Sequence, residues 1–290
     1  MIPEIGRLPM NPLLTGQAEF RQHVVYSENG QELTLIIPWN HRDPRGPVEP
    51  SPLIVFIQGS GWTTPNLDYE LPMLSRFAEE GVTVATVSHR STKDGYPFPA
   101  FLQDVKCAIR YLRAHAEEYM IDSDKVAAFG TSSGGNTACL LGLTGDDPAY
   151  RTEEYPEESD RVCAVAECFG PMELVRLFGQ RMEKDPAGAE ARLEAMFGPD
   201  RSLWNGKLAE FSPALRVKPG NKYPPFLLLH GTGDPVVPAE QMEIMYRSLK
   251  EAGADVSAFY VDGAEHEGNF WGPEVRRVIH DELTGRLGRF

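Results

Sequence analysis

Runs of almost uninterrupted apolar residues recur along the chain, and stretches with helical periodicity separate them. The first run, residues 53–57, reads Leu-Ile-Val-Phe-Ile. A run without polar alternation is typical of a strand that is buried on both faces of a sheet. Five further runs are predicted strands, the last with more alternation: residues 82–87, 126–129, 162–168, 226–229 and 256–261.

The stretches between these runs have the three- and four-residue spacing of amphipathic helices. The clearest covers residues 101–119, where apolar residues such as Phe101, Val105 and Leu112 share one face. Strands and helices alternate, which predicts an α/β fold with a mostly parallel central sheet and helices on both of its faces. In such folds ligands bind beyond the carboxyl ends of the strands, so catalytic residues are expected directly after strands.

The N-terminal region departs from this alternation. Strand-like residues 23–26 and 33–37 flank the pair Asn29-Gly30, which is a strong signal for a β-hairpin. The pattern predicts an antiparallel edge of the sheet. A proline-rich loop, residues 38–52, follows it.

Residues 171–219 also depart from the alternation of strands and helices. They contain no strand-like run, and their large apolar residues are scattered among charges and glycines. We interpret this segment as a cap or lid inserted into a single domain that spans residues 1–290. The alternative is a long helical connection with a purely structural role, since length alone does not separate the two.

Composition and charge exclude several classes of protein. Hydrophobic residues make up 41% and charged residues 24% of the chain, the balance of an ordinary globular protein. The net charge of −14 repels phosphate backbones and anionic membrane surfaces, so neither nucleic acid nor a membrane is an expected partner. No window reaches the roughly 20 apolar residues of a membrane span, and the N-terminus lacks signal-peptide features, which predicts a cytoplasmic protein. The sequence leaves open whether the protein forms a homo-oligomer.

The four cysteines, Cys107, Cys139, Cys163 and Cys168, give no sign of a metal site. They lie inside apolar segments and form no C-x-x-C pair, so we expect buried, reduced thiols. Neither a metal nor an organic cofactor is expected.

A nucleophile motif follows the predicted strand at residues 126–129. Gly130-Thr131-Ser132-Ser133-Gly134 is a G-x-S-x-G sequence, and a helical run begins directly after it. A sharp strand-to-helix turn of this kind needs small flanking glycines and directs helix amides at the central serine. Ser132 is therefore the candidate nucleophile, and Ser133 is better placed to donate its backbone N–H to an oxyanion.

A serine hydroxyl needs a positioned base to remove its proton. His266 is the best candidate, because it lies in the glycine-bounded loop 263–268 just beyond a predicted strand. We interpret the other six histidines as structural: His23, His41, His89, His115, His230 and His280. Two of them, His89 and His230, end predicted strands and could line the cavity.

The orienting acid is expected between the serine and the histidine in chain order. Asp234 follows a predicted strand through a glycine-rich turn, and we favour it. Asp262, the alternative, stands just before the histidine loop and fits a capping or turn residue better. Glu265 and Glu267 are too close in sequence to His266 to orient its ring easily.

A loop of small residues, Gln58-Gly59-Ser60-Gly61-Trp62, follows the strand at residues 53–57 and can present backbone N–H groups to a developing negative charge. Together with the segments GTSSGG, HGTGDPVVP and GAEHEG, in this order, it gives the chain a resemblance over about residues 53–283. The chain resembles bacterial carboxylesterases related to feruloyl and acetyl-xylan esterases, and more distantly the hormone-sensitive-lipase group.

The resemblance implies an α/β-hydrolase fold and a serine carboxylic ester hydrolase that forms an acyl-enzyme. It implies that the amides of Ser60, Gly61 and Ser133 form the oxyanion hole and that Trp62 walls the acyl site. The alternative for Trp62 is a buried aromatic residue of the core. Gln58 stands where the family has histidine and Ser60 where it has glycine, and both changes keep the backbone donors. The expected substrates are small-molecule esters with acetyl, other short-acyl or hydroxycinnamoyl groups.

Two other functions share these motifs. A serine peptidase of the same fold usually has a pocket for a peptide chain and often an extra domain. A non-catalytic receptor that has kept the fold typically loses a member of the triad, and none is missing here. Ester hydrolysis is therefore the function that the sequence favours.

Overall fold

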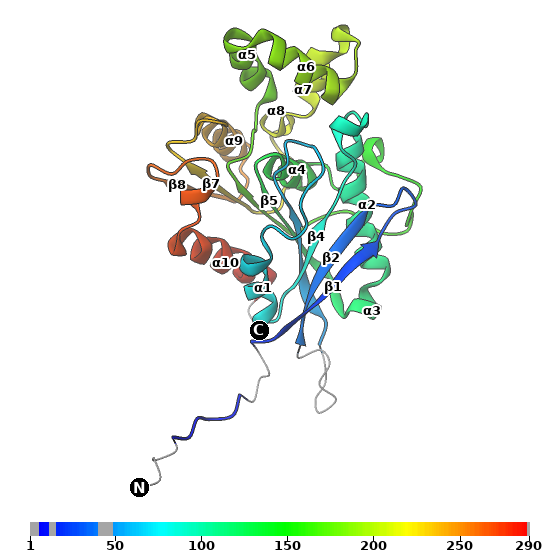
Figure 1. Cartoon of the computed structure of the whole chain (residues 1–290), viewed down its shortest axis with the longest axis vertical. Coiled ribbons are helices and arrows are strands. Elements are labelled where there is room, and N and C mark those ends of the chain that lie inside the picture. The colour runs from blue at the N-terminus through cyan, green and yellow to red at the C-terminus, as the bar shows by residue number, and fades with distance from the viewer. Residues whose placement is uncertain (1–5, 12–15, 40–48, 289–290) are drawn as a thin grey trace.

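A computed structural model describes residues 6–11, 16–39 and 49–288. Within this part of the chain, eight strands form one sheet in the order β1-β2-β4-β3-β5-β6-β7-β8 (Figure 1). The strands are β1 (Ala18–Val25), β2 (Glu32–Pro38), β3 (Ser51–Ile57), β4 (Thr83–Val87), β5 (Ile121–Thr131), β6 (Ala164–Cys168), β7 (Phe226–Gly231) and β8 (Val256–Val261).

Six of these strands run parallel, from β4 through β3, β5, β6 and β7 to β8. β1 and β2 form an antiparallel hairpin, and β2 also pairs antiparallel with β4. The predicted mostly parallel sheet with an antiparallel edge is therefore confirmed. Because parallel strands end at the same edge of a sheet, the loops after β3, β5, β7 and β8 open on one side of the molecule.

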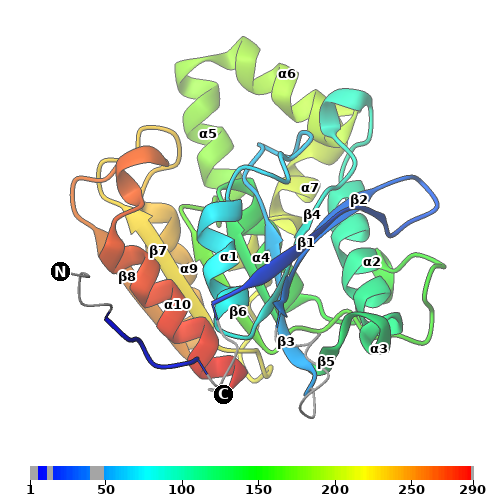
Figure 2. The ribbon, with the colours of Figure 1, turned by 60° about the horizontal axis from the view of Figure 1, so that its bottom comes forward.

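Helices cover both faces of the sheet (Figure 2). The α-helices are α1 (Leu71–Glu79), α2 (Ala100–Ala114), α3 (Ala116–Tyr119), α4 (Ser133–Leu143), α5 (Leu174–Lys184), α6 (Pro186–Phe197), α7 (Trp204–Glu210), α8 (Pro213–Arg216), α9 (Glu240–Glu251) and α10 (Pro273–Leu287). Short 3-10 helices lie at η2 (Thr92–Asp94), η3 (Pro148–Tyr150), η4 (Arg201–Leu203) and η5 (Gly268–Phe270). The predicted helical pattern at residues 101–119 forms α2 and α3, which meet at His115.

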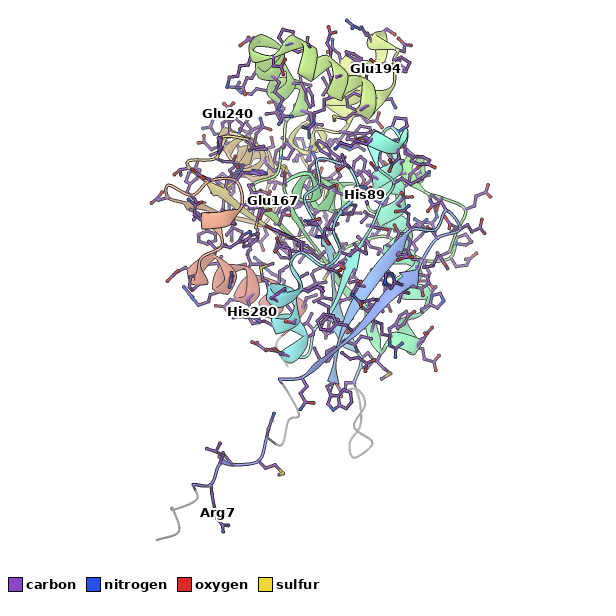
Figure 3. The ribbon with its side chains drawn as sticks, viewed as in Figure 1. Arg7, His89, Glu167, Glu194, Glu240 and His280 are labelled. Carbon is purple, nitrogen blue, oxygen red and sulfur yellow. The ribbon has the colours of Figure 1, made fainter. Side chains whose placement is uncertain are left out.

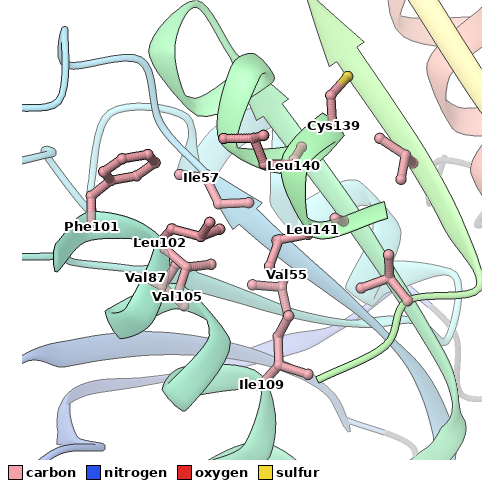
Figure 4. Packing of buried hydrophobic residues seen from close by; sticks show 14 of the residues in the cluster. Val55, Ile57, Val87, Phe101, Leu102, Val105, Ile109, Cys139, Leu140 and Leu141 are labelled. Atoms are coloured by element: carbon pink, nitrogen blue, oxygen red, sulfur yellow. The ribbon is translucent and has the colours of Figure 1, made fainter. Parts of the chain in front are cut away.

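The side-chain alternation of β3 shows how the sheet joins two hydrophobic cores. Val55 and Ile57 point into the larger cluster, where they meet α2 and α4 (Figure 4). Ile54 and Phe56 point into the second cluster, which α1 and α10 cover. Since both faces of the strand are buried, the uninterrupted apolar run that predicted it has a direct structural cause.

The N-terminal hairpin turns where the sequence predicts it. The N–H of Gly30, at φ +80°, donates to the carbonyl oxygen of Ser27 at 3.0 Å. The proline-rich loop is shorter than predicted at its end, because Pro52 already lies within β3. Residues 40–48 of that loop lie outside the described residues.

The segment 171–219 is helical and lies beyond the carboxyl ends of the strands, at the top of Figure 1. It is also anchored in the larger core: Phe197 and Phe211 pack against Phe98 with ring centroids 5.1 and 4.8 Å apart. The segment thus has features of both predicted alternatives, since it covers the strand ends and contributes to the core.

All four cysteines are free, and three of them are buried; Cys163 is a correction to the prediction, because its position just before β6 leaves it partly exposed. No helix in the described ranges is long and apolar enough to cross a membrane.

Candidate active site

The candidate nucleophile lies at the turn from β5 into α4. Ser132 has φ +50° and ψ −122°, a combination that L-residues rarely adopt and that costs about 1–3 kcal/mol. Its backbone is held on both sides: its N–H donates to the carbonyl oxygen of Cys168 at 2.9 Å, and its own carbonyl oxygen accepts from Asn136 N–H at 3.1 Å. The strained turn exposes the hydroxyl at the carboxyl edge of the sheet.

Two glycines make this turn sterically feasible. A Cβ at Gly130 would lie 2.1 Å from the carbonyl oxygen of Gly134, and a Cβ at Gly134 would lie 1.9 Å from that of Ile57. Both distances are far inside van der Waals contact, and the blocking atoms belong to the backbone. The glycines of the G-x-S-x-G motif are therefore required by close approach of strand and helix.

A chain of hydrogen bonds connects three of the predicted residues. Ser132 Oγ lies 3.0 Å from His266 Nε2, and His266 Nδ1 lies 2.7 Å from Asp234 Oδ2. The Asp234 side chain is fully buried, whereas 13% of the His266 side chain remains accessible. The structure thus brings together a hydroxyl, an imidazole and a carboxylate, and of the two aspartates that were weighed, Asp234 is the one that contacts the ring.

Asp234 is surrounded by hydrogen-bond donors. Burial alone raises the pKa of its carboxyl, but side-chain hydrogen bonds from His230 and His266 and backbone N–H groups outweigh this effect, so the pKa lies well below its usual range. The backbone donors are Val236 and Val237, whose N–H groups reach Oδ1 at 2.8 and 2.9 Å. Asp234 therefore stays ionised and fixed in place at neutral pH.

The acid loop and the base loop are packed directly on each other. A Cβ at Gly231 would lie 2.3 Å from the carbonyl oxygen of Ala264. Gly233 N–H donates to that same oxygen at 2.9 Å, and Gly263 N–H donates to Thr232 Oγ1 at 2.7 Å. These contacts explain the glycines around both loops and set the distance between the carboxylate and the ring.

The sequence reasoning missed two residues of the site. His230, interpreted as structural, is fully buried with its Nε2 atom 3.3 Å from Asp234 Oδ2 and 2.8 Å from the carbonyl oxygen of Val237. Phe169, directly after β6, packs its ring against that of His266 with centroids 4.7 Å apart. A signal existed for both, because each lies at or directly after the carboxyl end of a predicted strand.

The three backbone N–H groups predicted to form the oxyanion hole, those of Ser60, Gly61 and Ser133, differ in whether they already have an acceptor in this structure. Ser60 N–H already donates to Ser133 Oγ at 3.0 Å. Among the described residues no acceptor occurs for the N–H groups of Gly61 and Ser133. Ser133 is the first residue of α4, where backbone N–H groups have no intrahelical acceptor, so its donor points out of the helix end.

The side chains of this loop hold its shape. Ser60 Oγ donates to the carbonyl oxygen of Thr63 at 2.6 Å, and Thr63 Oγ1 donates back to the carbonyl oxygen of Ser60 at 2.7 Å. Gln58 Oε1 accepts the N–H of Asn66. The two residues that depart from the family pattern therefore brace the loop internally.

Trp62 requires a correction. Only 2% of the residue is exposed, and its ring packs against Phe98 and Phe101 in the larger core at 5.2 and 6.2 Å. Its positive φ of 60° turns the side chain away from the loop surface and into the core, which favours the buried-aromatic alternative over a wall of the acyl site. The indole N–H has no acceptor among the described residues.

Nowhere in the described ranges do three or more histidine, cysteine or acidic side chains gather in a way that could hold a metal ion. The arrangement can deliver a serine alkoxide to an electrophilic carbon, accept its proton on an imidazole and stabilise negative charge with amides.

The parallel sheet, the strained serine between β5 and α4, and the aspartate and histidine on the loops after β7 and β8 are the features of an α/β hydrolase. The chain belongs to the BD-FAE family, which matches residues 43–249.

Known relatives agree with this assignment. Esterase LipC of Mycobacterium tuberculosis is 29% identical over 251 residues, which are 85% of this chain and 59% of LipC. Esterase LipQ of the same organism is 26% identical over 267 residues, 91% of this chain and 61% of LipQ. The chain thus spans only about three fifths of the length of these two curated relatives.

A solved structure extends over nearly the whole chain. The butyrate-bound form of esterase Est2 from Thermogutta terrifontis has a TM-score of 0.73 and 25% sequence identity, and the alignment covers 94% of this chain and 95% of that one.

Proposed function

We propose that this protein is a carboxylic ester hydrolase in which Ser132, His266 and Asp234 act as a catalytic triad. The observation that carries the proposal is the pair of distances from Ser132 Oγ to His266 Nε2, 3.0 Å, and from His266 Nδ1 to Asp234 Oδ2, 2.7 Å. The strained conformation of Ser132 supports it, because strain of this kind is retained where function requires it. The esterase relatives support the choice of an ester rather than an amide.

In the proposed reaction, His266 Nε2 takes the proton of Ser132 Oγ while Oγ bonds to the ester carbonyl carbon. The carbonyl oxygen becomes an oxyanion, and the N–H groups of Gly61 and Ser133 are free to bind it. Ser60 N–H joins them if it exchanges Ser133 Oγ for the oxyanion. The C–O bond then breaks, and His266 gives the proton to the departing alcohol. Water, activated by the same imidazole, hydrolyses the acyl-enzyme and restores Ser132.

Small acyl groups are the proposed substrates. Butyrate in the Est2 structure supports a short acyl chain, and the resemblance of the sequence motifs supports acetyl or hydroxycinnamoyl esters as further members of the class. Phe169 is fully buried against the ring of His266, so it positions the imidazole and does not line the acyl site.

We further propose that α5 and α6 act as the cap of this site. The N–H of Phe98 donates to the carbonyl oxygen of Met196 at 2.7 Å, so the end of α6 is tied to the main body. Glu240, at the start of α9, accepts hydrogen bonds from Arg176 and Gln180 of α5 (Figure 3). Because α5 and α6 are both anchored, we expect the cap to select substrates by their shape and not to open widely for large ones.

The test is hydrolysis by the wild type and by Ser132→Ala of p-nitrophenyl esters of increasing acyl length, acetylated xylo-oligosaccharides and methyl ferulate. We expect activity on at least one short ester, and loss of both turnover and organophosphonate labelling in the variant, because alanine cannot form an acyl-enzyme. Ser75→Ala on α1 is the matched control and should retain both. Activity retained by a pure, folded Ser132→Ala protein would refute the mechanism.

A further inference from the structure

Two arginines of the cap segment have no acidic partner among the residues that the structure describes. Residues 171–219 contain five arginines, and three of them form ion pairs. Arg176 lies 2.8 Å from Glu240, Arg201 lies 2.6 Å from Glu190, and Arg216 lies 3.5 Å from Asp147. Arg181 and Arg192 are the remaining two, and no carboxylate of the described residues lies within ion-pair distance of either. In a chain of net charge −14, carboxylates are plentiful, so the lack of a partner for both calls for a reason.

Arg192 lies against the oxyanion loop. Its Nη2 atom is 2.6 Å from the point where a Cβ of Gly61 would stand, so the guanidinium occupies the space that only glycine leaves open. Gly59, two residues earlier, contacts Ser132: a Cβ there would lie 2.6 Å from the Ser132 Cβ. The Arg192 guanidinium therefore lies against the same short loop that packs on Ser132.

Arg181 lies against the acid loop. Its Nη2 atom donates to the carbonyl oxygen of Val236 at 3.4 Å, and the N–H of the same Val236 donates to Asp234 Oδ1. Its guanidinium also lies over the ring of Phe178, 5.2 Å from the centroid. The two arginines thus reach down from α5 and α6 to loops on either side of the triad.

The charge of one arginine also affects the pKa of the other. Burial and the charge of Arg192 lower the pKa of Arg181 to about 10, and burial lowers the pKa of Arg192. Arg192 is exposed to solvent, so a dissolved anion can reach it. Both groups remain protonated at neutral pH, so two like charges are held near each other without a counter-ion. An anion between them relieves both the repulsion and the desolvation.

The helices that carry the arginines are fixed. Arg192 lies one turn before Met196, whose carbonyl oxygen binds Phe98 N–H, so it sits at the anchored end of α6. Arg181 follows Gln180, which donates to Glu240 at 2.7 Å. Figure 3 shows Glu240 directly beneath α5 and Glu194, a neighbour of Arg192, on the outer part of the cap. The Arg181 guanidinium is held by the carbonyl oxygen of Val236 and the ring of Phe178, and a guanidinium held in place binds a planar anion with less loss of side-chain entropy than a mobile one.

We propose that Arg181 and Arg192 bind a carboxylate that the ester substrate carries apart from its scissile carbonyl. This rests on the proposed function and narrows its substrate class to anionic esters. A guanidinium binds a carboxylate through two parallel hydrogen bonds, and two of them can hold it from both sides. The scissile carbonyl lies at Ser132, and the arginines receive the charged end of the substrate.

The competing explanation is structural: each guanidinium could merely clamp the cap to a main-chain loop. The two explanations differ in what they predict for neutral substrates. Loss of a clamp lowers the turnover of every ester, whereas loss of an anion site lowers that of anionic esters alone. The comparison of matched esters therefore separates them.

The experiment measures kcat/KM for two pairs of matched esters. In the first pair the acyl group differs: mono-p-nitrophenyl succinate against p-nitrophenyl butyrate. In the second the alcohol differs: p-acetoxybenzoate against p-acetoxybenzamide. The variants are Arg181→Gln, Arg192→Gln and the double variant. Arg192→Lys is the conservative change, and Arg247→Gln, an exposed arginine of α9 that pairs with Glu243 at 3.1 Å, is the control.

We expect the ratio of anionic to neutral kcat/KM to fall in at least one pair by roughly tenfold or more for each glutamine variant, because a hydrogen bond to a charged group is lost. The rates on neutral esters and all rates of the Arg247→Gln control should change little, and Arg192→Lys should recover part of the ratio. The pair that responds identifies which half of the substrate carries the charge. An unchanged ratio in both pairs, or a parallel fall for anionic and neutral esters, overturns the proposal while leaving the esterase function intact.

A binding measurement covers the case in which the wild type hydrolyses none of these esters, which would count against the proposed function itself. Ligand-observed NMR with monomethyl succinate and methyl butyrate is performed on Ser132→Ala and on the same protein with both arginines replaced by glutamine. Preferential binding of the succinate ester that disappears with the arginines supports the anion site. Equal binding of the two esters, or binding that the arginine changes do not affect, overturns it.

Discussion

His230 Nε2 lies 3.3 Å from Asp234 Oδ2, the same oxygen that His266 Nδ1 contacts at 2.7 Å. Two imidazoles thus share one carboxylate oxygen, one of them buried and one partly accessible. The buried ring also bonds the carbonyl oxygen of Val237, the residue whose N–H binds Asp234 Oδ1. His230 therefore ties the acid to its own loop and acts as a positioning residue.

His230→Phe should lower kcat/KM by roughly tenfold or more, because a hydrogen bond near a charged carboxylate is removed. With one donor fewer, Asp234 interacts more strongly with protonated His266, so the acid limb of the pH–rate profile should move to higher pH. The measurement is kcat/KM on a neutral ester from about pH 5 to 8, the range in which histidine normally titrates. A rate loss with an unmoved acid limb would show that His230 acts only through the stability of the loop.

Asp234→Asn should reduce kcat by several powers of ten, since an amide no longer fixes the imidazole in the tautomer that accepts the serine proton. Another serine hydrolase loses about 10⁴-fold on the corresponding change. Asp262→Asn is the matched control, because it changes an aspartate only four residues before His266 and should cost little. If the two variants exchange their effects, Asp262 is the acid and the geometry of the Asp234 contact is not that of catalysis.

Glu167, in the middle of the molecule (Figure 3), should make stability fall as the pH rises. Burial raises the pKa of its carboxyl to about 8, against which the hydrogen bond from Gly170 N–H is the smaller effect. The folded state thus holds a proton that the unfolded state releases at its ordinary pKa. This contribution is complete below the unfolded pKa and is lost on the way to about pH 8, at about 1.4 kcal/mol per unit.

Glu167→Gln mimics the protonated carboxyl, so its free energy of unfolding should lack this decline. Urea unfolding of the wild type and the variant at about pH 6 and about pH 8.5, on either side of the shifted pKa, tests the difference. The advantage of the variant should grow with pH, while Glu79→Gln, an exposed residue of α1, should follow the wild type. Equal pH dependence in Glu167→Gln and the wild type would contradict a buried, protonated Glu167.

The sheet and the triad contacts were predictable because their signals are local. A strand buried on both faces has an apolar run, and a strand-to-helix turn with a strained serine needs glycine on both sides, as Gly130 and Gly134 show. Chain order allowed both Asp234 and Asp262, and the glycine-rich turn after a strand favoured Asp234, whose carboxylate contacts the ring of His266 in the structure.

The rest depended on contacts between distant segments. Trp62 follows the oxyanion loop in sequence, yet the positive φ at that residue sends its ring into the core, and no local pattern shows this. The contact of Arg192 with Gly61 joins residues 131 positions apart and appears only once α6 is placed over the loop. Likewise, the sequence pattern places His230 at the end of a buried strand, which is typical of a structural residue. Its contact with Asp234 across the following turn appears only in the structure.

The oxyanion loop gives the last prediction, which separates the main chain of Ser60 from its hydroxyl. Ser60→Ala keeps the N–H and removes only the bond from Oγ to Thr63, so kcat should change little while stability falls by about 1 kcal/mol. Ser60→Pro deletes the N–H, and the loss of one oxyanion donor costs roughly 10²–10³ in kcat.

The bond from Ser60 N–H to Ser133 Oγ adds a third variant to this series. If the amide has to leave Ser133 Oγ to bind the oxyanion, Ser133→Ala frees it, and kcat should hold or rise. Circular dichroism and thermal melts establish that each variant is folded before rates are compared. If Ser60→Ala loses as much activity as Ser60→Pro in well-folded proteins, the hydroxyl is the working group. A large loss of kcat in Ser133→Ala alone would mean instead that the hydrogen bond from Ser60 N–H to the Ser133 hydroxyl keeps the oxyanion donors in place.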